Sequence, residues 1–349
     1  MYTFTANYLT QRLIISPDIL RIVGQIREYK GKQALYAERK PEVLENLRRV
    51  AFIESVESSN RLEHIETDRK SLQNIVQRRE EPQSRPQTEL AGYRDVLESI
   101  HQNHSGMRFS PSLVQQLHRD LLQYTPTPGG NFKNSPNDIV EKNEQGEIIR
   151  VRFRTVQPYL TPSAMNQLHD GFRGALQNHD PLILIPNYVH DFLCIHPFAD
   201  GNGRMARLLT VLLLYQHGFE VPRYVSLEKL IEDTKESYYE TLNIADRNWN
   251  EGTHDHRPFT EYMLGIVLGA YRLLEGDIER VQTGRGHKTS LVLQAVEALP
   301  AVFSIADVEN RCPSVGRDTI RNVLQRLASE GRIRNVSKGR SAKWNKMGY

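Results

Sequence analysis

The segment HPFADGNGRMAR, from His196 to Arg207, joins two apolar segments and gathers several chemically active side chains within twelve residues. Upstream, Ile183 to Ile195 has the composition of a buried helix that Pro197 would end. Downstream, a second helix is expected to begin at Asn202 to Arg204. Its core face would carry Leu208, Leu209, Leu212 and Leu213. The segment is therefore predicted to be a short loop between two buried helices.

Two glycines and two arginines in this segment suit a phosphate group. Gly201 and Gly203 allow the backbone to turn successive N–H groups inward, and the positive end of the following helix dipole lies at the same place. Arg204 and Arg207 are three residues apart on the first turns of that helix, where their planar forks can grip a polyphosphate. We therefore predict a polyphosphate site here.

An acid and an imidazole complete the predicted site. Asp200 offers an oxygen ligand suited to Mg²⁺, which usually joins nucleotide sites through one carboxylate and phosphate oxygens. His196 can take the proton from a hydroxyl that attacks phosphorus. Each feature alone has a plain explanation, such as a common turn, a core histidine or solvated arginines. Their combination in one segment favours catalysis.

The segment resembles the signature of the Fic family, His-x-Phe-x-acid-Gly-Asn-Gly-Arg-x-x-Arg, at every defined position. The similarity extends upstream through His190 and downstream through the Tyr238-Tyr239 pair. The resemblance implies a mainly α fold, a Fic-type helical bundle with a small β-hairpin flap. It also implies a protein adenylyltransferase (AMPylase), a nucleotidyltransferase that moves AMP from ATP to a hydroxyl of a target protein and releases pyrophosphate.

The resemblance assigns roles to residues at the start of the segment. His196 is the general base, Asp200 holds Mg²⁺, and Asn202 contacts phosphate. By the same resemblance, the intact segment favours AMP as the transferred group. Transfer of other phosphate-containing groups, or removal of AMP from modified proteins, remains an alternative within the family.

The resemblance also assigns the ATP contacts. Gly201 and Gly203 form the anion cradle, and Arg204 clamps phosphate. Arg207 reaches the γ-phosphate and orients ATP so that the α-phosphate faces the attacking hydroxyl. The family places an aromatic side chain against adenine downstream, so Tyr239 is the candidate; a buried core tyrosine is the other interpretation.

Apolar and basic residues alternate from Ile149 to Arg154, after the turn-prone segment Asn143 to Gly146. This pattern predicts a β-hairpin. It resembles the Fic flap, which holds a target segment by strand addition. The basic residues would favour acidic targets, whereas the plain alternative is a structural hairpin with one solvated side.

A hydroxyl and a carboxylate lie four residues apart at Ser59 and Glu63, on one face of the helix predicted from Val43 to Leu62. Fic proteins with an N-terminal inhibitory helix carry Ser/Thr-x-x-x-Glu followed by Gly or Asn. Here His64 follows, which departs from that pattern. The resemblance predicts autoinhibition, in which Glu63 pairs with Arg207 and takes the place of the γ-phosphate. The alternative is an ordinary surface glutamate.

The bulk composition is that of a globular protein. The 349 residues are 39% hydrophobic and 25% charged, with a net charge of +3, so the whole chain does not look like a nucleic-acid-coating protein. Cys194 and Cys312 have no companion cysteine at zinc or redox spacing, which favours a reducing cytoplasm. The first residues do not resemble a leader, and no segment is apolar enough for a membrane span.

Breaks in periodicity predict three regions. The polar run Arg78 to Glu89 is predicted to be a surface loop, and a second boundary falls at Val281 to Ser290. The predicted regions are an N-terminal helical region with the inhibitory helix (1–88), a Fic catalytic core (89–280) and a small C-terminal domain (288–349).

The C-terminal domain is predicted to be a winged helix-turn-helix. Leu291 to Leu299, Ile305 to Val308 and the apolar stripe Ile320, Val323, Leu324 and Leu327 indicate three helices. Ser314 is the predicted cap of the last helix and Gly331 its end. Two strands, Arg332 to Val336 and Ala342 to Trp344, would flank a turn at Lys338-Gly339.

This domain is also strongly basic. From Arg311 to Tyr349 there are ten Lys or Arg against two acids, Asp318 and Glu330. The outer helix face would carry Arg317, Arg321, Asn322, Gln325 and Arg326. These residue types suit phosphate and base-edge contacts, so DNA is a candidate partner, and protein docking or dimerisation is the alternative.

Two functions from different classes follow. The preferred one is a cytoplasmic protein adenylyltransferase that uses ATP and Mg²⁺, acts on a Ser, Thr or Tyr hydroxyl of a target protein and on itself, and is held inactive by Glu63. The alternative is a DNA-binding regulator or antitoxin-like partner whose site senses ATP or only modifies the protein itself. A homodimer is compatible with both, and neither involves a membrane.

Overall fold

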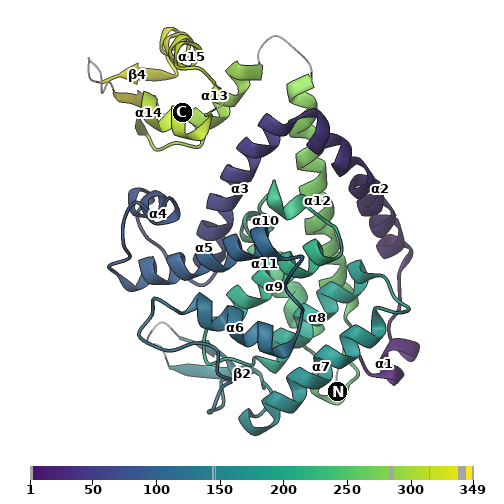
Figure 1. The fold of residues 1–349 in the computed structure, drawn as a ribbon. Helices are drawn as coiled ribbons and strands as arrows, with labels where there is room; N and C mark the ends of the chain where they lie inside the picture. Colours follow the sequence, from purple (N-terminus) through teal and green to yellow (C-terminus); the bar gives the residue numbers. More distant parts are fainter. Residues whose placement is uncertain are drawn as a thin grey trace.

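The structure is a computed structural model and describes residues 3–143, 145, 147–282, 287–313, 315–336 and 343–347. A large helical part carries the segment from His196 to Arg207, and a small part with helices and short strands lies at the C-terminal end (Figure 1). The predicted mainly α class is confirmed. Among the described residues, no helix is long and apolar enough to cross a membrane.

Helices make up nearly all of the large part. They are α1 (Ala6–Gln11), α2 (Pro17–Arg39), α3 (Pro41–Arg61), α4 (Arg69–Val76), α5 (Arg85–Asn103), α6 (Pro111–Leu121), α7 (Thr161–Ala175), α8 (Pro181–Ile195), α9 (Asn202–Gln216), α10 (Leu227–Asp233), α11 (Lys235–Ala245) and α12 (Arg257–Gln282). Three short 3-10 turns lie at Pro158–Leu160, Val221–Arg223 and Trp249–Glu251.

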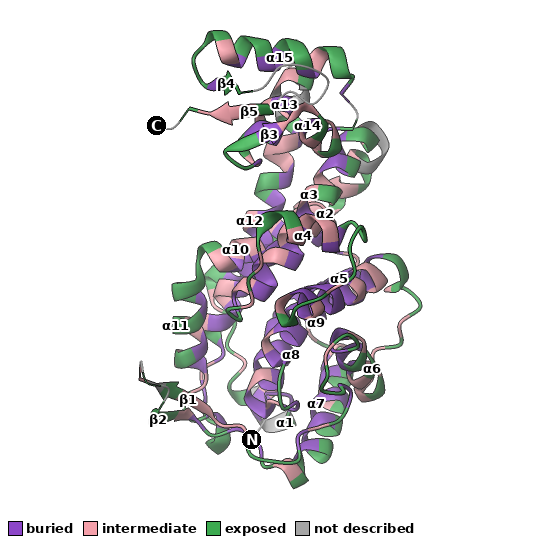
Figure 2. Cartoon of the chain, turned by 90° about the vertical axis from the view of Figure 1, so that its left-hand side faces the viewer, coloured by how far each residue is buried: buried purple, intermediate pink, exposed green. Residues whose placement is uncertain are grey.

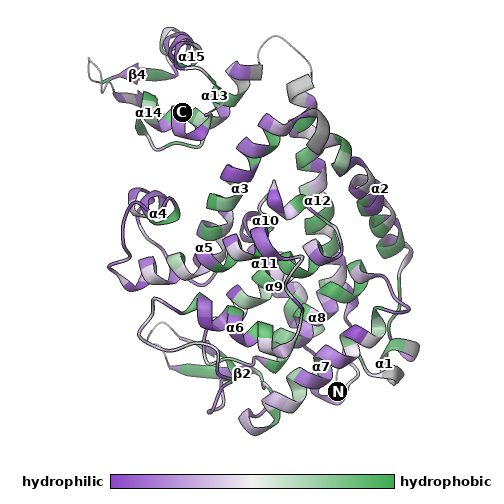
Figure 3. Ribbon diagram, in the orientation of Figure 1, coloured by the Kyte–Doolittle hydropathy of each residue, from purple (hydrophilic) through white to green (hydrophobic). Residues whose placement is uncertain are grey.

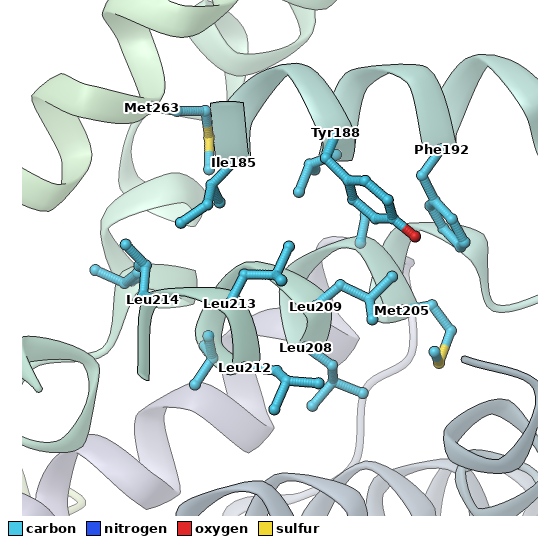
Figure 4. Packing of buried hydrophobic residues seen from close by; sticks show 14 of the residues in the cluster. Ile185, Tyr188, Phe192, Met205, Leu208, Leu209, Leu212, Leu213, Leu214 and Met263 are labelled. Carbon is cyan, nitrogen blue, oxygen red and sulfur yellow. The ribbon is translucent and has the colours of Figure 1, made fainter. Parts of the chain in front are cut away.

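The two helices on either side of the loop form the centre of the core. Almost every residue of α8 and α9 is buried, as Figure 2 shows by colour. In Figure 4, Ile185, Tyr188 and Phe192 of α8 lie opposite the leucines and Met205 of α9. Burying a large apolar side chain contributes roughly 1.5–3 kcal/mol, so this pair fixes the loop between them on a rigid base.

The start of α5 corrects one prediction. The run Arg78 to Glu89 is not a loop throughout, because α5 begins at Arg85. The side chain of Ser84 accepts a hydrogen bond from the Gln87 N–H, and the Gln87 side chain accepts one from the Ser84 N–H. This reciprocal cap, with Pro86 in the first turn, starts the helix inside the polar run.

The predicted hairpin is present. Strand β1 (Ile139–Lys142) pairs antiparallel with β2 (Ile148–Phe153), with Val140 opposite Val151. Residues 144 and 146 of the turn lie outside the described residues. Ile148 and Ile149 are 62% and 66% exposed, so the apolar residues at this end of β2 do not pack on the core, and only Phe153 is buried.

The small part contains α13 (His287–Glu297), β3 (Val302–Ser304), α14 (Ile305–Arg311), α15 (Arg317–Ser329), β4 (Ile333–Asn335) and β5 (Lys343–Lys346). The strands form an antiparallel sheet in the order β3-β5-β4. Its apolar core, from Val292 to Ile333, is a cluster separate from that of the large part.

Some details of this part differ from the sequence prediction. Strand β3 was not predicted, and Gly316 is the residue at the cap position of α15. Ser314, Lys338-Gly339 and Ala342 lie outside the described residues. Gly331 has a positive φ of 72° directly after the last turn of α15, where a left-handed residue ends a helix. The winged-helix assignment and the domain limits 1–88, 89–280 and 288–349 stay predictions.

Candidate active site

The loop between α8 and α9 turns sharply at both ends. His196 adopts a left-handed conformation (φ 52°, ψ 59°) after the last residue of α8. Gly201 is also left-handed (φ 79°) and stands directly before α9. A left-handed histidine is strained relative to glycine, so the surrounding contacts must hold His196 in place. The loop thus places His196 beside the amino end of α9.

One hydrogen bond fixes the chemistry of His196. Its Nδ1 lies 3.1 Å from the carbonyl oxygen of Leu193. Because a carbonyl can only accept, Nδ1 carries the proton and Nε2 keeps a free lone pair. Burial lowers the pKa of His196 below its ordinary value, although the Leu193 carbonyl acts in the opposite direction. The imidazole is therefore neutral near pH 7, as a base requires.

The other loop residues brace the turn. The Asn202 side chain donates to the Phe198 carbonyl (2.7 Å) and accepts from the Phe198 N–H (3.0 Å). Both ends of this amide are occupied within the loop, so in this structure the Asn202 side chain does not point at a phosphate. The first N–H groups of α9 are left for an anion, since the first turn of a helix has no internal partners for them.

Asp200 lies in the loop directly before Gly201, with its carboxylate largely open to solvent. Its side chain is 64% exposed, and its Oδ1 accepts a hydrogen bond of 2.6 Å from the Gly201 N–H. The other oxygen has no hydrogen-bond partner among the described residues. A single exposed carboxylate at the edge of an anion cradle fits Mg²⁺, which keeps most of its waters and shares phosphate oxygens.

The two arginines of α9 have different partners. Arg204 is 1% exposed, and its Nη1 lies 2.8 Å from Oε2 of Glu89 on α5. Nη1 has no hydrogen bond of acceptable direction, so the contact is an ion pair. The nearest Asp200 oxygen is 3.8 Å away. Glu89 was not predicted from the sequence, because nothing in its own segment marks it as a partner of the loop.

Arg207 is held by the end of α3. Its Nη2 donates to Glu63 Oε1 and to the Ser59 carbonyl, both at 2.8 Å. Its Nε donates to the Ser59 hydroxyl, also at 2.8 Å. The Arg207 side chain is 4% exposed and that of Glu63 is 35% exposed. Burial, the largest single influence, lowers the pKa of Arg207, but Glu63, Tyr238 and Tyr93 together raise it more, so the guanidinium stays charged.

Glu63 also covers the cradle. A Cβ atom added to Gly203 would overlap Glu63 Oε1, and the Arg207 guanidinium is 3.4 Å from the same point. The carboxylate therefore lies against the backbone of the first turn of α9. His64 is left-handed (φ 59°), a conformation that costs least for Gly and is uncommon for other residues, although Asn, Asp and His adopt it more often than most. This conformation explains why Gly or Asn suits the position after the glutamate.

The two tyrosines of α11 differ in how far they are buried. Tyr238 is 4% exposed and belongs to the core, whereas Tyr239 is 38% exposed. The Tyr239 hydroxyl lies 3.3 Å from the Leu62 carbonyl oxygen, next to Glu63. Burial, followed by Glu63, raises the pKa of Tyr239. Tyr239 is thus the accessible aromatic ring beside the site.

A second histidine supports the loop from α6. His118 Nδ1 accepts a hydrogen bond from the Gly130 N–H (2.8 Å), so its Nε2 carries the proton that bonds to the Asp200 carbonyl (3.0 Å). The ring stacks on Phe198, with centroids 3.7 Å apart. Burial lowers its pKa to about 4. His118 is a neutral brace and was not predicted.

A buried lysine supports the other end of the loop. Lys133 Nζ donates to the Ile195 carbonyl (3.0 Å), the Thr155 hydroxyl (2.8 Å) and the Asn137 side-chain oxygen (2.6 Å). Asn137 in turn donates to the carbonyls of His196 (3.2 Å) and Phe198 (2.7 Å). No signal in the sequence separates Lys133 and Asn137 from ordinary loop residues, so they too were missed.

Comparison with known families identifies the class of domain. Residues 108–214 match the Fic/DOC family, so the chain contains a Fic/DOC domain. This range includes the whole loop from His196 to Arg207 and the supporting residues His118 and Lys133. Glu63, Glu89 and Tyr239 lie outside it.

Two relatives give the similarity at the level of individual proteins. The chain is 41% identical over 82 residues to a Fido domain-containing protein of Dictyostelium discoideum, covering 24% of this chain and 50% of that protein. It is 29% identical over 152 residues to the protein adenylyltransferase Fic of Drosophila mojavensis, covering 43% of this chain and 26% of that protein. The chain thus spans half or less of the length of these relatives.

The fold is also similar to a solved structure. A Fic family protein from Desulfovibrio desulfuricans superposes with a TM-score of 0.63 at 22% sequence identity, over 96% of this chain and 98% of that chain. At this identity the likeness concerns the fold alone. It confirms the predicted Fic-type arrangement of helices.

Proposed function

We propose that this protein transfers AMP from ATP to a hydroxyl group of a target protein. One observation carries the proposal. His196 is neutral, with Nδ1 tied to the Leu193 carbonyl and Nε2 free, and it stands beside a glycine cradle at the amino end of α9. The base and the anion site are therefore adjacent, which in-line displacement at a phosphate requires.

The reaction uses the loop as follows. Nε2 of His196 takes the proton of the target hydroxyl while the hydroxyl oxygen forms a bond to the α-phosphorus. The bond between that phosphorus and the bridging oxygen breaks, and pyrophosphate leaves. The N–H groups of Asn202 and Gly203, with Arg204 and Arg207, hold the phosphates. Mg²⁺ held by Asp200 would neutralise charge on the phosphate oxygens.

The adenine of ATP and the target segment each need a further surface. Tyr239 offers an accessible ring next to the loop for adenine. The β1–β2 hairpin offers exposed backbone edges to an extended target segment, and its basic residues favour acidic neighbours of the hydroxyl.

Autoinhibition by α3 is the second element of the proposal. Arg207 donates three hydrogen bonds to Ser59 and Glu63, and Glu63 lies against Gly203. A γ-phosphate must take the same guanidinium, so ATP cannot bind productively until Glu63 leaves. Removing one carboxylate should therefore raise activity.

The test compares incorporation of α-labelled ATP into protein by the parent, Glu63→Gly, and the double variant with His196→Ala. We expect label in Glu63→Gly, little in the parent and none in the double variant. Glu66→Gly is the matched control, because Glu66 is exposed and near in sequence. Absence of label from all forms would favour the regulator, and equal label in parent and Glu63→Gly would reject the inhibition.

A DNA contact of the C-terminal part is the second candidate function. Arg317, Arg321, Asn322, Gln325 and Arg326 all lie on the exposed face of α15. This helix is largely hydrophilic in Figure 3. Several of these arginines pair with acids at 3.1–3.5 Å, which a phosphate would have to displace. Binding of duplex DNA that falls steeply with salt would support it, and salt-independent or absent binding would remove it.

The buried Cys194 and Cys312, which form no disulfide, suit a cytoplasmic compartment.

A further inference from the structure

A histidine, a cysteine and an aspartate meet in the core behind the loop. His190 and Cys194 are one turn apart on α8, and Asp246 follows the last residue of α11. Their ligand atoms are mutually close: His190 Nε2 to Asp246 Oδ1 is 3.2 Å, Cys194 Sγ to Asp246 Oδ1 is 3.5 Å, and Cys194 Sγ to His190 Nε2 is 3.5 Å. His190 and Cys194 are each 1% exposed.

We propose that His190, Cys194 and Asp246 bind a zinc ion that ties α11 to α8. The cysteines alone gave no such indication, because their spacing matches no zinc pattern. The site instead combines one cysteine with a histidine four residues earlier and an aspartate far along the chain.

The three separations match the edges of a zinc tetrahedron. Zinc lies about 2.3 Å from sulfur, about 2.0–2.1 Å from imidazole nitrogen and about 2.0–2.2 Å from carboxylate oxygen. With tetrahedral angles, these bond lengths place nitrogen about 3.3–3.5 Å from oxygen, and sulfur about 3.5–3.7 Å from both. The observed 3.2, 3.5 and 3.5 Å lie at or just below the short end of these ranges.

The unused nitrogen of His190 gives a second, independent reason. Nδ1 is buried, has no hydrogen-bond partner among the residues that the structure describes, and lies 3.9 Å from Asp191 Oδ1. If a neutral His190 donated from Nε2 to Asp246, the Nδ1 lone pair would face the Asp191 carboxylate. If Nε2 binds a metal instead, Nδ1 carries the proton and faces that carboxylate favourably. Carboxylate, histidine and metal commonly stand in this order.

Asp191 itself is not a ligand. Its oxygens accept hydrogen bonds from the Thr3 N–H and hydroxyl, both at 2.9 Å, and from Trp249 Nε1 at 2.7 Å. These donors hold the carboxylate in its outer position. The neighbouring His254 bonds the Thr3 hydroxyl through Nε2 at 3.0 Å, and it groups with His190 and Asp191 rather than with Cys194 and Asp246, so it lies outside the proposed site.

Charge and space are also compatible with zinc. The Cys194 thiol would lose its proton to solvent as the sulfur–zinc bond forms, and the thiolate and Asp246 would together cancel the charge of the ion. Arg152 stands 3.8 Å from the second oxygen of Asp246 and so holds the carboxylate from outside. A cavity of about 390 Å³ has Asp246 and Arg152 in its wall, so the site borders solvent on the side of Asp246.

The first experiment uses the untagged full chain. The protein is incubated with zinc chloride, desalted, and its metal content is measured by mass spectrometry. We expect about one zinc ion per chain, as a single site predicts. Replacement by Co²⁺ should produce the near-ultraviolet charge-transfer band of a sulfur–cobalt bond. A parent protein that retains no zinc and shows no cobalt–sulfur band overturns the proposal.

The chain offers a matched control, because its two cysteines are both buried. Cys194→Ser should lose the cobalt–sulfur band and at least tenfold in zinc affinity, as loss of even an outer partner costs about 10–100-fold. Cys312→Ser should keep both, since the Cys312 thiol only donates to the Val308 carbonyl at 2.9 Å. A band that persists in Cys194→Ser and vanishes in Cys312→Ser would place the metal elsewhere. Asp246→Asn serves if Cys194→Ser does not fold.

Discussion

Arg207 is the side chain on which the proposed inhibition and the proposed ATP contact both depend. Ser59 supplies two of its acceptors and Glu63 the third, and all three come from the last turn of α3 and the residues that follow. Since the guanidinium is buried, it requires such partners in any state. A phosphate of ATP can accept hydrogen bonds from the same guanidinium, so under the proposed inhibition one helix end would control the site.

The protonation state of His196 predicts how the transfer rate depends on pH. Burial lowers the pKa of His196 below the ordinary histidine value of about 6.5. The imidazole therefore stays neutral when the pH falls to about 6.5. In the Glu63→Gly variant, the transfer rate should be constant from pH 8 to about 6.5 and then fall up to tenfold per unit once the imidazole protonates. Label incorporation at several pH values measures it. His64→Asn should leave the profile unchanged, and a rate already halved above pH 7 would contradict the assignment.

The ion pair between Glu89 and Arg204 predicts that Glu89→Gln, which replaces one carboxylate oxygen by an amide nitrogen, lowers stability strongly. Glu89→Gln keeps the shape but leaves the Arg204 charge, 1% exposed, with only the more distant Asp200 carboxylate at 3.8 Å. Loss of one member of a buried pair costs about 3–5 kcal/mol, so we expect a lower unfolding midpoint in urea and weaker transfer.

Arg85→Gln is the control for this prediction. Arg85 contacts the same carboxylate at 2.8 Å from outside and is 80% exposed. Its removal should cost no more than about 1 kcal/mol. Equal losses in the two variants would mean that the burial of Arg204 is not the cause.

At the scale of elements, the helices around the loop could be predicted from the sequence. Pro197 and the glycines set their limits, and apolar spacing set their faces. The start of α5 could also have been found, since Ser84 and Gln87 fit a capping box. Strand β3 could not, because three residues carry no clear alternation. His118, Lys133 and Glu89 reach the loop only through tertiary contacts, which local patterns do not encode.

Two glycines in helices predict opposite effects of the same substitution. A Cβ added to Gly92 on α5 would overlap the Leu121 carbonyl on α6, so the helices must separate. Gly92→Ala should therefore destabilise the protein by about 1–3 kcal/mol and loosen His118, which lies on α6. Gly24→Ala on α2 meets no atom within 4 Å and should stabilise by up to about 1 kcal/mol. Thermal unfolding of both variants checks the contrast, and a stable Gly92→Ala would refute the close packing of α5 on α6.

Across the whole molecule, buried histidines predict sensitivity to acid. Burial lowers the pKa of His101 to about 3 and those of His118 and His169 to about 4. Between about pH 6.5 and these values, the unfolded chain binds more protons than the folded one, so stability falls as the pH falls. Each histidine contributes at most about 1.4 kcal/mol per pH unit. Urea midpoints at pH 7.5, 6 and 5 should decrease in that order, and a constant midpoint would count against neutral buried histidines.

The contact of Glu63 with Arg207 lies within one chain, so diluting the protein does not weaken it. A tethered group has a high effective concentration, in the millimolar range or above, that does not change when the protein is diluted. Free nucleotide therefore competes for Arg207 with a carboxylate that stays tethered beside it. If Glu63 inhibits as proposed, activation depends on moving α3, and a signal that shifts this helix would act as a switch at constant ATP.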